Sequence, residues 1–126
     1  ILGIDISKTA IDKAKNFYPK LDFKVDNILN ISQYNNFDCM FFAEITWYLL
    51  EEKKLDKIFN IMSKNFKGKN KFFIHNLSFY EDGIQQYGKD YFATLDEFIE
   101  FCPFELLEKV QVDSKDGIAS SAIFKI

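Results

Sequence analysis

The opening stretch, residues 1–7, constrains the fold more than any other part of the chain. Ile and Leu fill four of the first six positions without an alternating polar side chain, a pattern that predicts a strand buried on both faces. The strand ends at Asp5, and Ser7 is a typical helix N-cap. In open parallel α/β sheets an acid at such a strand end accepts hydrogen bonds from the ribose hydroxyls of a nucleotide cofactor. The alternative is an Asx turn over Asp5, Ile6 and Ser7 without a ligand.

Composition narrows the classes of protein that fit. The chain has 126 residues, 28% of them charged, and a formal net charge of -3, which is typical of one soluble globular domain. Its lysines are scattered among acids, so a nucleic-acid partner is not expected. No apolar run approaches the length that spans a membrane. Cys39 and Cys102 lie in apolar settings and indicate buried, reduced thiols of a cytoplasmic protein, so neither a disulfide nor a metal site is predicted.

Strand and helix patterns alternate along the first part of the chain. Apolar residues at helical spacing predict helices over Lys8 to Phe17 and over Glu51 to Phe66. Alternating side chains predict a half-covered strand over Leu21 to Val25, whereas the continuous apolar run Phe37 to Ala43 predicts a central strand. A further strand is predicted over Phe72 to Ile74. Such alternation requires a parallel sheet with right-handed crossovers.

The last third has a different character. The segment Ser78 to Phe92 is too long for a plain connector, so it is either a substrate-covering loop or disordered. A capping box at Thr94 predicts a short helix that ends near Phe101. Two strands, Phe104 to Val112 and Ile118 to Ile126, then form a predicted hairpin. The predicted fold class is therefore α/β, with a mostly parallel sheet that finishes in an antiparallel hairpin.

Taken together, these segments resemble the class I S-adenosylmethionine-dependent methyltransferases, particularly their small-molecule branch, over residues 1–126. The resemblance rests on Gly3 to Ser7 and the helix after it, on Phe23 to Ile28, on Phe37 to Leu49, on Lys67-Gly68 and on the terminal hairpin. It implies a Rossmann-like sheet that starts at the family's second strand. The family's first strand and Gly-rich loop would precede Ile1. We therefore expect an N-terminally truncated, partial methyltransferase domain, which is either a shortened chain or completed by a segment supplied from elsewhere.

The same resemblance implies two consequences of that missing strand. It would lie between two apolar strands, so their inner edges would be exposed and could cause self-association. The fragment alone is expected to be inactive and to bind the cofactor weakly or not at all.

The resemblance also implies where S-adenosylmethionine binds. Asp5 would bind the ribose hydroxyls and Ile6 would pack against the adenine. At the end of the next strand the family has an acid that accepts a hydrogen bond from the adenine amino group. The register places Asn27 in that position with Ile28 after it, while Asp26 is the nearest carboxylate. An Asn carbonyl can accept the same bond, so the departure still permits binding.

Further positions follow at the ends of later strands. By resemblance, Ala43 and Glu44 would lie along the methionine part and Ile45 against the cofactor. Tyr48 occupies a position where small-molecule members often carry His, and it can orient a substrate hydroxyl; alternatively it packs under the following helix. His75 is predicted at the carboxyl end of its strand, where a ring facing the cleft could take a proton from the substrate. The alternative for His75 is a purely structural hydrogen bond.

The function implied by the resemblance is methyl transfer from S-adenosylmethionine to an oxygen or nitrogen atom of a small-molecule acceptor. Two alternatives stay open. One is an NAD(P)-binding Rossmann oxidoreductase, which would also use Asp5, and the other is a non-catalytic binding domain.

Overall fold

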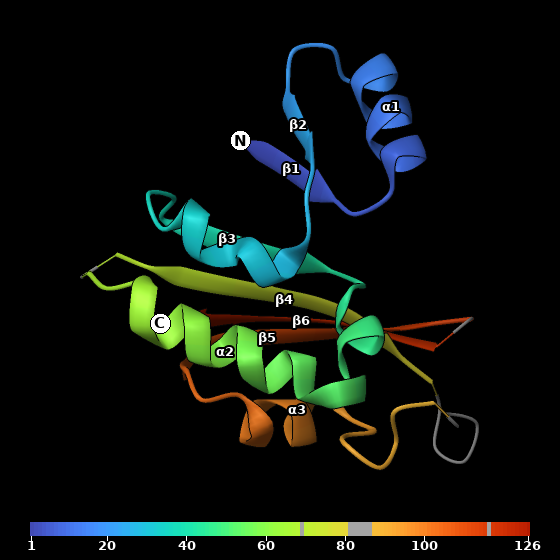
Figure 1. Cartoon of the computed structure of the whole chain (residues 1–126). Coiled ribbons are helices and arrows are strands. Elements are labelled where there is room, and N and C mark those ends of the chain that lie inside the picture. The colour runs from blue at the N-terminus through green and yellow to red at the C-terminus, as the bar shows by residue number, and fades with distance from the viewer. Residues whose placement is uncertain (69, 81–86, 116) are drawn as a thin grey trace.

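The strands of the computed structural model form two sheets (Figure 1), and the structure describes residues 1–68, 70–80, 87–115 and 117–126. In the smaller sheet, β1 (Leu2–Asp5) pairs in parallel with β2 (Asp22–Val25). The larger sheet has the order β3-β4-β6-β5. Its strands are β3 (Cys39–Ala43), β4 (Phe72–Phe79), β5 (Glu105–Ser114) and β6 (Gly117–Lys125). Strand β3 is parallel to β4, and β6 is antiparallel to both of its neighbours.

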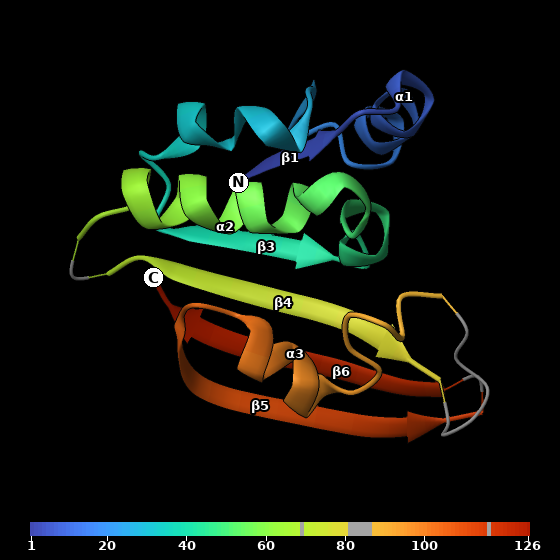
Figure 2. The same ribbon diagram turned by 60° about the horizontal axis from the view of Figure 1, so that its bottom comes forward.

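Helices connect and cover these strands. The helix α1 (Lys8–Phe17) joins β1 to β2, and α2 (Lys54–Asn65) and α3 (Leu95–Phe101) lie on one face of the larger sheet (Figure 2). Short 3-10 helices are also present among the described residues: η1 (Ile28–Tyr34) follows β2, η2 (Thr46–Leu49) follows β3, and η3 (Glu51–Lys53) comes between η2 and α2. In both views the β1–β2 pair lies on the β3 side of the larger sheet, and β1, β3 and β4 point the same way.

The hydrophobic core lies between the larger sheet and its two helices. Ile58 and Met62 of α2, Phe98 of α3, Phe73 of β4 and Phe124 of β6 have no exposed surface. Full burial of one such side chain stabilises a fold by about 1.5–3 kcal/mol. This packed layer therefore fixes the positions of the strand ends that could carry a site.

Several sequence predictions are confirmed, including the α/β class and the terminal hairpin. The Ser7 hydroxyl accepts a hydrogen bond from the Ala10 amide at 3.2 Å and begins α1. Gly3 is required by close packing, because a Cβ atom there would lie 2.5 Å from the Phe23 ring of β2. The parallel part of the sheet and its antiparallel end are both present, with two parallel and two antiparallel strand pairings among the described residues.

The predicted burial of two strands is wrong. In β1, Ile4 is 37% exposed, so this strand is not covered on both faces. In β3, Phe41 is 61% exposed while its neighbour Phe42 is buried, so only one face of this strand is covered. Cys39 is exposed on β3, contrary to expectation, whereas Cys102 is buried as predicted.

Some boundaries also differ from the predictions. Strand β4 continues to Phe79 instead of ending at Ile74, which shortens the expected long connector; residues 81–86 of that connector lie outside the described residues. Helix α2 begins at Lys54, later than Glu51, because Glu52 and Lys53 have positive φ angles of 57° and 53°. Within the described residues, no helix is both long enough and apolar enough to cross a membrane.

Candidate functional site

The carboxyl ends of β1 and β2 bring two acidic residues together. Asp5 is the register partner of Val25, and the Asp26 amide donates a hydrogen bond to the Asp5 carbonyl at 3.1 Å. Ligands of open α/β sheets bind outside the carboxyl ends of the strands. The loops that leave β1 and β2 are therefore the first part of the candidate site.

Asp5 makes the Asx turn that the sequence offered as an alternative. One of its carboxylate oxygens accepts a hydrogen bond from the Ser7 amide at 2.6 Å. The side chain is exposed, and an ionised carboxylate has about four acceptor positions, so the turn leaves capacity for ligand hydroxyls. Ile6 beside it is 72% exposed. An exposed acid next to an exposed apolar side chain suits a ribose and a flat base.

Asp26 is the centre of a hydrogen-bond network. Its Oδ1 accepts from the Asn27 amide at 2.8 Å and from Asn30 Nδ2 at 2.7 Å. Its Oδ2 lies 2.8 Å from Lys24 Nζ and accepts from the buried Tyr34 hydroxyl. These bonds, the one from Lys24 first, hold the pKa of the Asp26 carboxyl well below its usual range. The same pair, with Asp26 as the main cause, raises the pKa of Lys24 above its usual range.

Asn27 begins the η1 helix. Its side-chain oxygen accepts a hydrogen bond from the Leu29 amide at 2.9 Å, as an N-cap residue does. Asn27 itself is exposed, and Ile28 after it is half-buried. The η1 helix then buries Ile31 and Tyr34.

The end of β3 carries a strained residue. Glu44 has a φ of 53°, unusual for a residue with a side chain, and its carboxylate binds Ser78 twice, accepting from the amide at 3.1 Å and from the hydroxyl at 2.7 Å. Ala43 is exposed and Ile45 is half-buried. Both oxygens of Glu44 therefore tie β3 to β4, and strain held in place by such bonds is common at functional sites.

Tyr48 extends from η2, directly after β3. It is 78% exposed, so the alternative in which it packs under α2 does not apply. Its neighbour Trp47 instead packs against Phe79 and Phe92, with ring centroids 5.7 and 5.5 Å apart. Trp47 thus anchors this loop, and Tyr48 stands outside it near the carboxyl ends of the parallel strands.

His75 lies in the core and not in a cleft, which corrects the prediction of a catalytic base. Its ring has no exposed surface and stacks on Phe98 with centroids 3.6 Å apart. Nε2 lies 2.8 Å from the buried Thr46 hydroxyl, and Nδ1 has no hydrogen-bond partner among the described residues. Burial lowers the pKa of His75 to about 3. Strand β4 runs past His75 to Phe79, which places the residue in mid-strand on the helix-covered face.

Three residues of this region were missed by the sequence reasoning. Lys24 and Tyr34 are 10 positions apart and meet because η1 folds back onto the end of β2. A signal existed for Lys24, because Lys24 and Asp26 are two positions apart and therefore project to the same side of an extended segment. Ser78 is 34 positions from Glu44, and no local pattern connects them.

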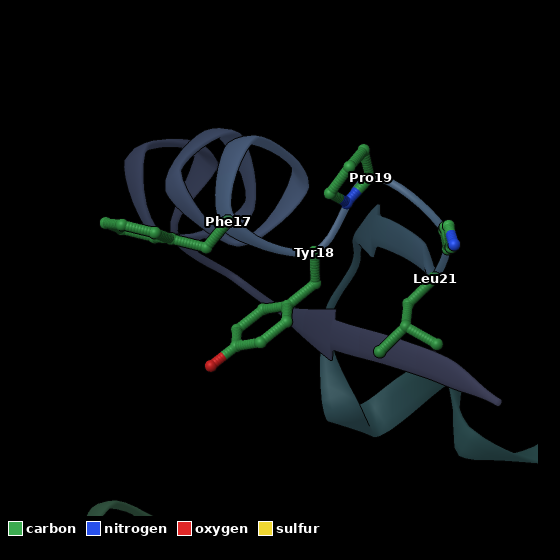
Figure 3. Close-up of a pocket in the computed structure, with 5 residues that line it drawn as sticks. Phe17, Tyr18, Pro19 and Leu21 are labelled. Carbon is green, nitrogen blue, oxygen red and sulfur yellow. The ribbon is translucent and has the colours of Figure 1, made fainter.

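Other features of the surface do not add to the site. An open depression at the turn between α1 and β2 is lined by residues 17–21 (Figure 3). It lies at the amino end of β2, opposite Asp26. Among the described residues no group of three or more His, Cys, Asp or Glu side chains could hold a metal ion.

Comparisons with known proteins bear on the fold. No protein-family model matches the sequence, and a search of curated proteins also found no match. Solved structures do match. The N-methyltransferase NodS from Bradyrhizobium japonicum is 21% identical with a TM-score of 0.74, and the match covers 98% of this chain and 71% of that one. The complex of NodS with S-adenosyl-L-homocysteine matches at 20% identity and a TM-score of 0.73, covering 98% of this chain and 64% of that one.

A second protein gives the same result. An S-adenosylmethionine-dependent methyltransferase from Clostridium acetobutylicum is 14% identical with a TM-score of 0.68, and 99% of this chain matches 74% of its length. The chain thus spans about two thirds to three quarters of these proteins. At these identities the likeness concerns the fold. The chain has the fold of the class I S-adenosylmethionine-dependent methyltransferases.

Proposed function

We propose that this protein takes part in the transfer of a methyl group from S-adenosylmethionine to an oxygen or nitrogen atom of a small molecule. The observation that supports this best is the order β3-β4-β6-β5, in which an antiparallel strand lies between β4 and β5. The same arrangement matches over 98% of the chain an N-methyltransferase whose structure holds S-adenosyl-L-homocysteine. The free thiols of Cys39 and Cys102 suit a reducing cytoplasmic location, which belongs to the same proposal.

The cofactor would lie across the ends of β1, β2 and β3. Asp5 would accept from the ribose hydroxyls, and Ile6, which is 72% exposed, would lose water-exposed surface against the adenine. Asn27 and Ile28, with Asp26 behind them, would face the edge of the base. Ala43 and Glu44 would lie along the methionine part, and Ile45 would lie against the cofactor.

The cofactor supplies an electrophilic methyl group on a sulfonium ion. The contribution of the protein is then mainly to hold the acceptor atom in line with that methyl group. Tyr48 is exposed at the same end of the sheet, so it could orient an acceptor hydroxyl or amine through its phenol. His75 is not included, because its ring is enclosed in the core.

Two rival functions remain and predict different ligands. An NAD(P)-dependent oxidoreductase would also use Asp5, but its sheet does not normally end in this antiparallel hairpin. A non-catalytic domain would bind neither cofactor. Whether the protein binds S-adenosylhomocysteine, NAD or neither therefore distinguishes the three functions.

The test is isothermal titration calorimetry of the full-length protein with S-adenosylhomocysteine and with NAD. We expect binding of S-adenosylhomocysteine alone. Asp5→Ala should weaken that binding by about 1.5–3 kcal/mol, the range for hydrogen bonds to a charged group. Asp12→Ala is the matched control, because Asp12 is an exposed acid of α1 that is paired with Lys8. Binding of NAD alone would support the oxidoreductase, and no binding of either ligand would support the non-catalytic domain.

A further inference from the structure

Every acceptor position of the Asp26 carboxylate is occupied by the protein itself. Oδ1 has two partners, the Asn27 amide and Asn30 Nδ2. Oδ2 has two partners, Lys24 Nζ and the Tyr34 hydroxyl. A carboxylate offers about four such positions. A ligand N–H could bind Asp26 only by displacing one of these charge-assisted bonds, which are about twice as strong as neutral ones.

The partners of Asp26 are themselves held in place. Lys24 Nζ also binds the Tyr34 hydroxyl at 2.9 Å and lies 5.2 Å from the centre of the Tyr34 ring. Tyr34 is 8% exposed and ends η1. The network therefore joins the last residues of β2 to the far end of η1, across the whole of that helix.

This network also holds Asn27, which lies between the end of β2 and the start of η1, in one conformation. Its backbone amide donates to Asp26, and its side-chain oxygen accepts from the Leu29 amide. Because a backbone N–H donates to an oxygen and not to an NH₂ group, the bond from the Leu29 amide assigns the positions of Oδ1 and Nδ2 in the Asn27 carboxamide. The remaining lone pair of Oδ1 and the two Nδ2 protons are then presented in a defined order on an exposed side chain.

From these contacts we propose that Lys24, Asn30 and Tyr34 are positioning residues that hold Asp26 as an internal strut, so that Asn27 and not Asp26 recognises the base of the ligand. The inference rests on the proposed function, because it assumes an adenine-containing ligand at this strand end. An Asn carboxamide with its oxygen and nitrogen fixed matches a donor next to an acceptor, as on the edges of adenine. A 6-oxo purine presents the opposite order and should be rejected.

The experiment compares two probes, S-adenosylhomocysteine and S-inosylhomocysteine, whose purines carry a 6-amino and a 6-oxo group. The measured quantity is the ratio of their dissociation constants in calorimetry on the full-length protein. We expect the wild-type protein to prefer the adenine compound by at least about tenfold, as for a two-point contact to a base edge. Asn27→Ala should bring the ratio close to one.

The positioning variants are Tyr34→Phe and Lys24→Met. Each should reduce the preference by about threefold or more, because the removal of one partner of Asp26, the buried Tyr34 hydroxyl or the half-exposed Lys24 ammonium, loosens the turn that holds Asn27. A purely structural role would weaken both probes equally and leave the ratio unchanged. Tyr18→Phe and Lys8→Met are matched controls, since Tyr18 is 61% exposed and the Lys8 side chain is 78% exposed; neither should change the ratio.

Three results would overturn the inference. One is an unchanged ratio in both positioning variants, and another is loss of the preference in Asp26→Asn while Asn27→Ala keeps it. The third is tighter binding of S-adenosylhomocysteine by Tyr34→Phe, which would show that Tyr34 competes with the ligand for Asp26.

A ligand-free measurement separates this inference from the proposed function. In carbon-detected NMR the Asp26 carboxyl should stay ionised at a pH where ordinary aspartates take up protons, and Lys24→Met should move its titration toward the ordinary range. Titration of the Asp26 carboxyl in the ordinary range in the wild-type protein would contradict its role as an internal strut, even if S-adenosylhomocysteine binds. Failure of both probes to bind would overturn the proposed function, and with it the recognition by Asn27, even if the strut is present.

Discussion

The β1–α1–β2 segment and the larger sheet are stabilised in different ways. Of residues 1–25, which form the first region, only Ile11 is buried. The second region, β3-β4-β6-β5 with α2 and α3, encloses a continuous cluster of buried aromatic and aliphatic side chains. The proposed contacts to the ribose and base belong to the first region and the loop after it. Ligand-binding parts often come from the least stable parts of a fold, so binding and stability should respond to different substitutions.

The largest expected effect is the loss of stability caused by a substitution in the core of the second region. Phe73 is fully buried and its ring contacts those of Phe42, Phe59, Phe104 and Phe124. Phe73→Ala should lower the free energy of unfolding by about 3–5 kcal/mol, the usual cost of such a cavity. Urea denaturation followed by the fluorescence of Trp47, which packs in this region, would measure it.

The matched substitution in the first region is Phe17→Ala. Phe17 is 77% exposed at the end of α1, so its loss should change the free energy of unfolding by no more than about 0.5 kcal/mol. A large effect of Phe17→Ala would show that the first region is packed more tightly than its exposure indicates.

A smaller effect on the free energy of unfolding is expected from a change of pH, through the buried His75 of the core. The pKa of His75 is about 3 in the folded protein and about 6.5 in an unfolded chain. Below pH 6.5 the unfolded state therefore binds the proton more readily, so stability is complete above that pH and decreases as the pH falls toward 3. Between pH 6.5 and pH 5 the loss should be about 1–2 kcal/mol, since one pKa unit corresponds to about 1.4 kcal/mol.

The control for this effect is His75→Gln, which cannot titrate and should give a flatter pH dependence in the same urea experiment. Asp26 does not interfere with this measurement. Its pKa is lowered from the ordinary value of 3.8, so the stability that its ionised form contributes is present above that pH and decreases only below it. If wild type and His75→Gln lose stability equally between pH 6.5 and pH 5, His75 is not held neutral in the core.

The two regions were not equally predictable from the sequence. Helix α1 was predicted at its observed bounds, because Ser7 caps it and Pro19 follows it. The ends of β1, β2 and β3 were placed nearly correctly by the acids and amides that follow the apolar runs. Local signals of this kind depend on neighbours in the chain, so the sequence contains them.

The errors arose where distant segments meet. His75 was placed at a strand end because the apolar run stops there, yet β4 continues through Asn76 and Ser78, whose polar groups bind Ser120, Ser121 and Glu44. The burial of Phe41 was overestimated because a continuous apolar strand was assumed to be covered on both faces. The pairing of Glu44 with Ser78 and of Lys24 with Tyr34 depends on tertiary packing, which spacing in the sequence does not reveal.

The smallest expected effect concerns the strand edges that face the boundary between the two regions. Among the described residues β1 pairs only with β2, and β3 pairs only with β4, so each has one edge without a backbone partner. Edges of this kind promote pairing with another chain. We therefore expect weak, concentration-dependent self-association of the chain of residues 1–126, measurable by sedimentation velocity.

A charge on the exposed face of β3 should reduce that association. Phe41 is 61% exposed on this strand, and lysine on an exposed edge strand disfavours edge-to-edge pairing. Phe41→Lys should weaken self-association by about threefold to tenfold, or about 0.7–1.4 kcal/mol. Phe17→Lys removes a similarly exposed phenylalanine from α1 and should leave association unchanged. Equal weakening by both variants would mean that general surface hydrophobicity causes the association, and a strictly monomeric wild-type chain at high concentration would contradict pairing through these edges altogether.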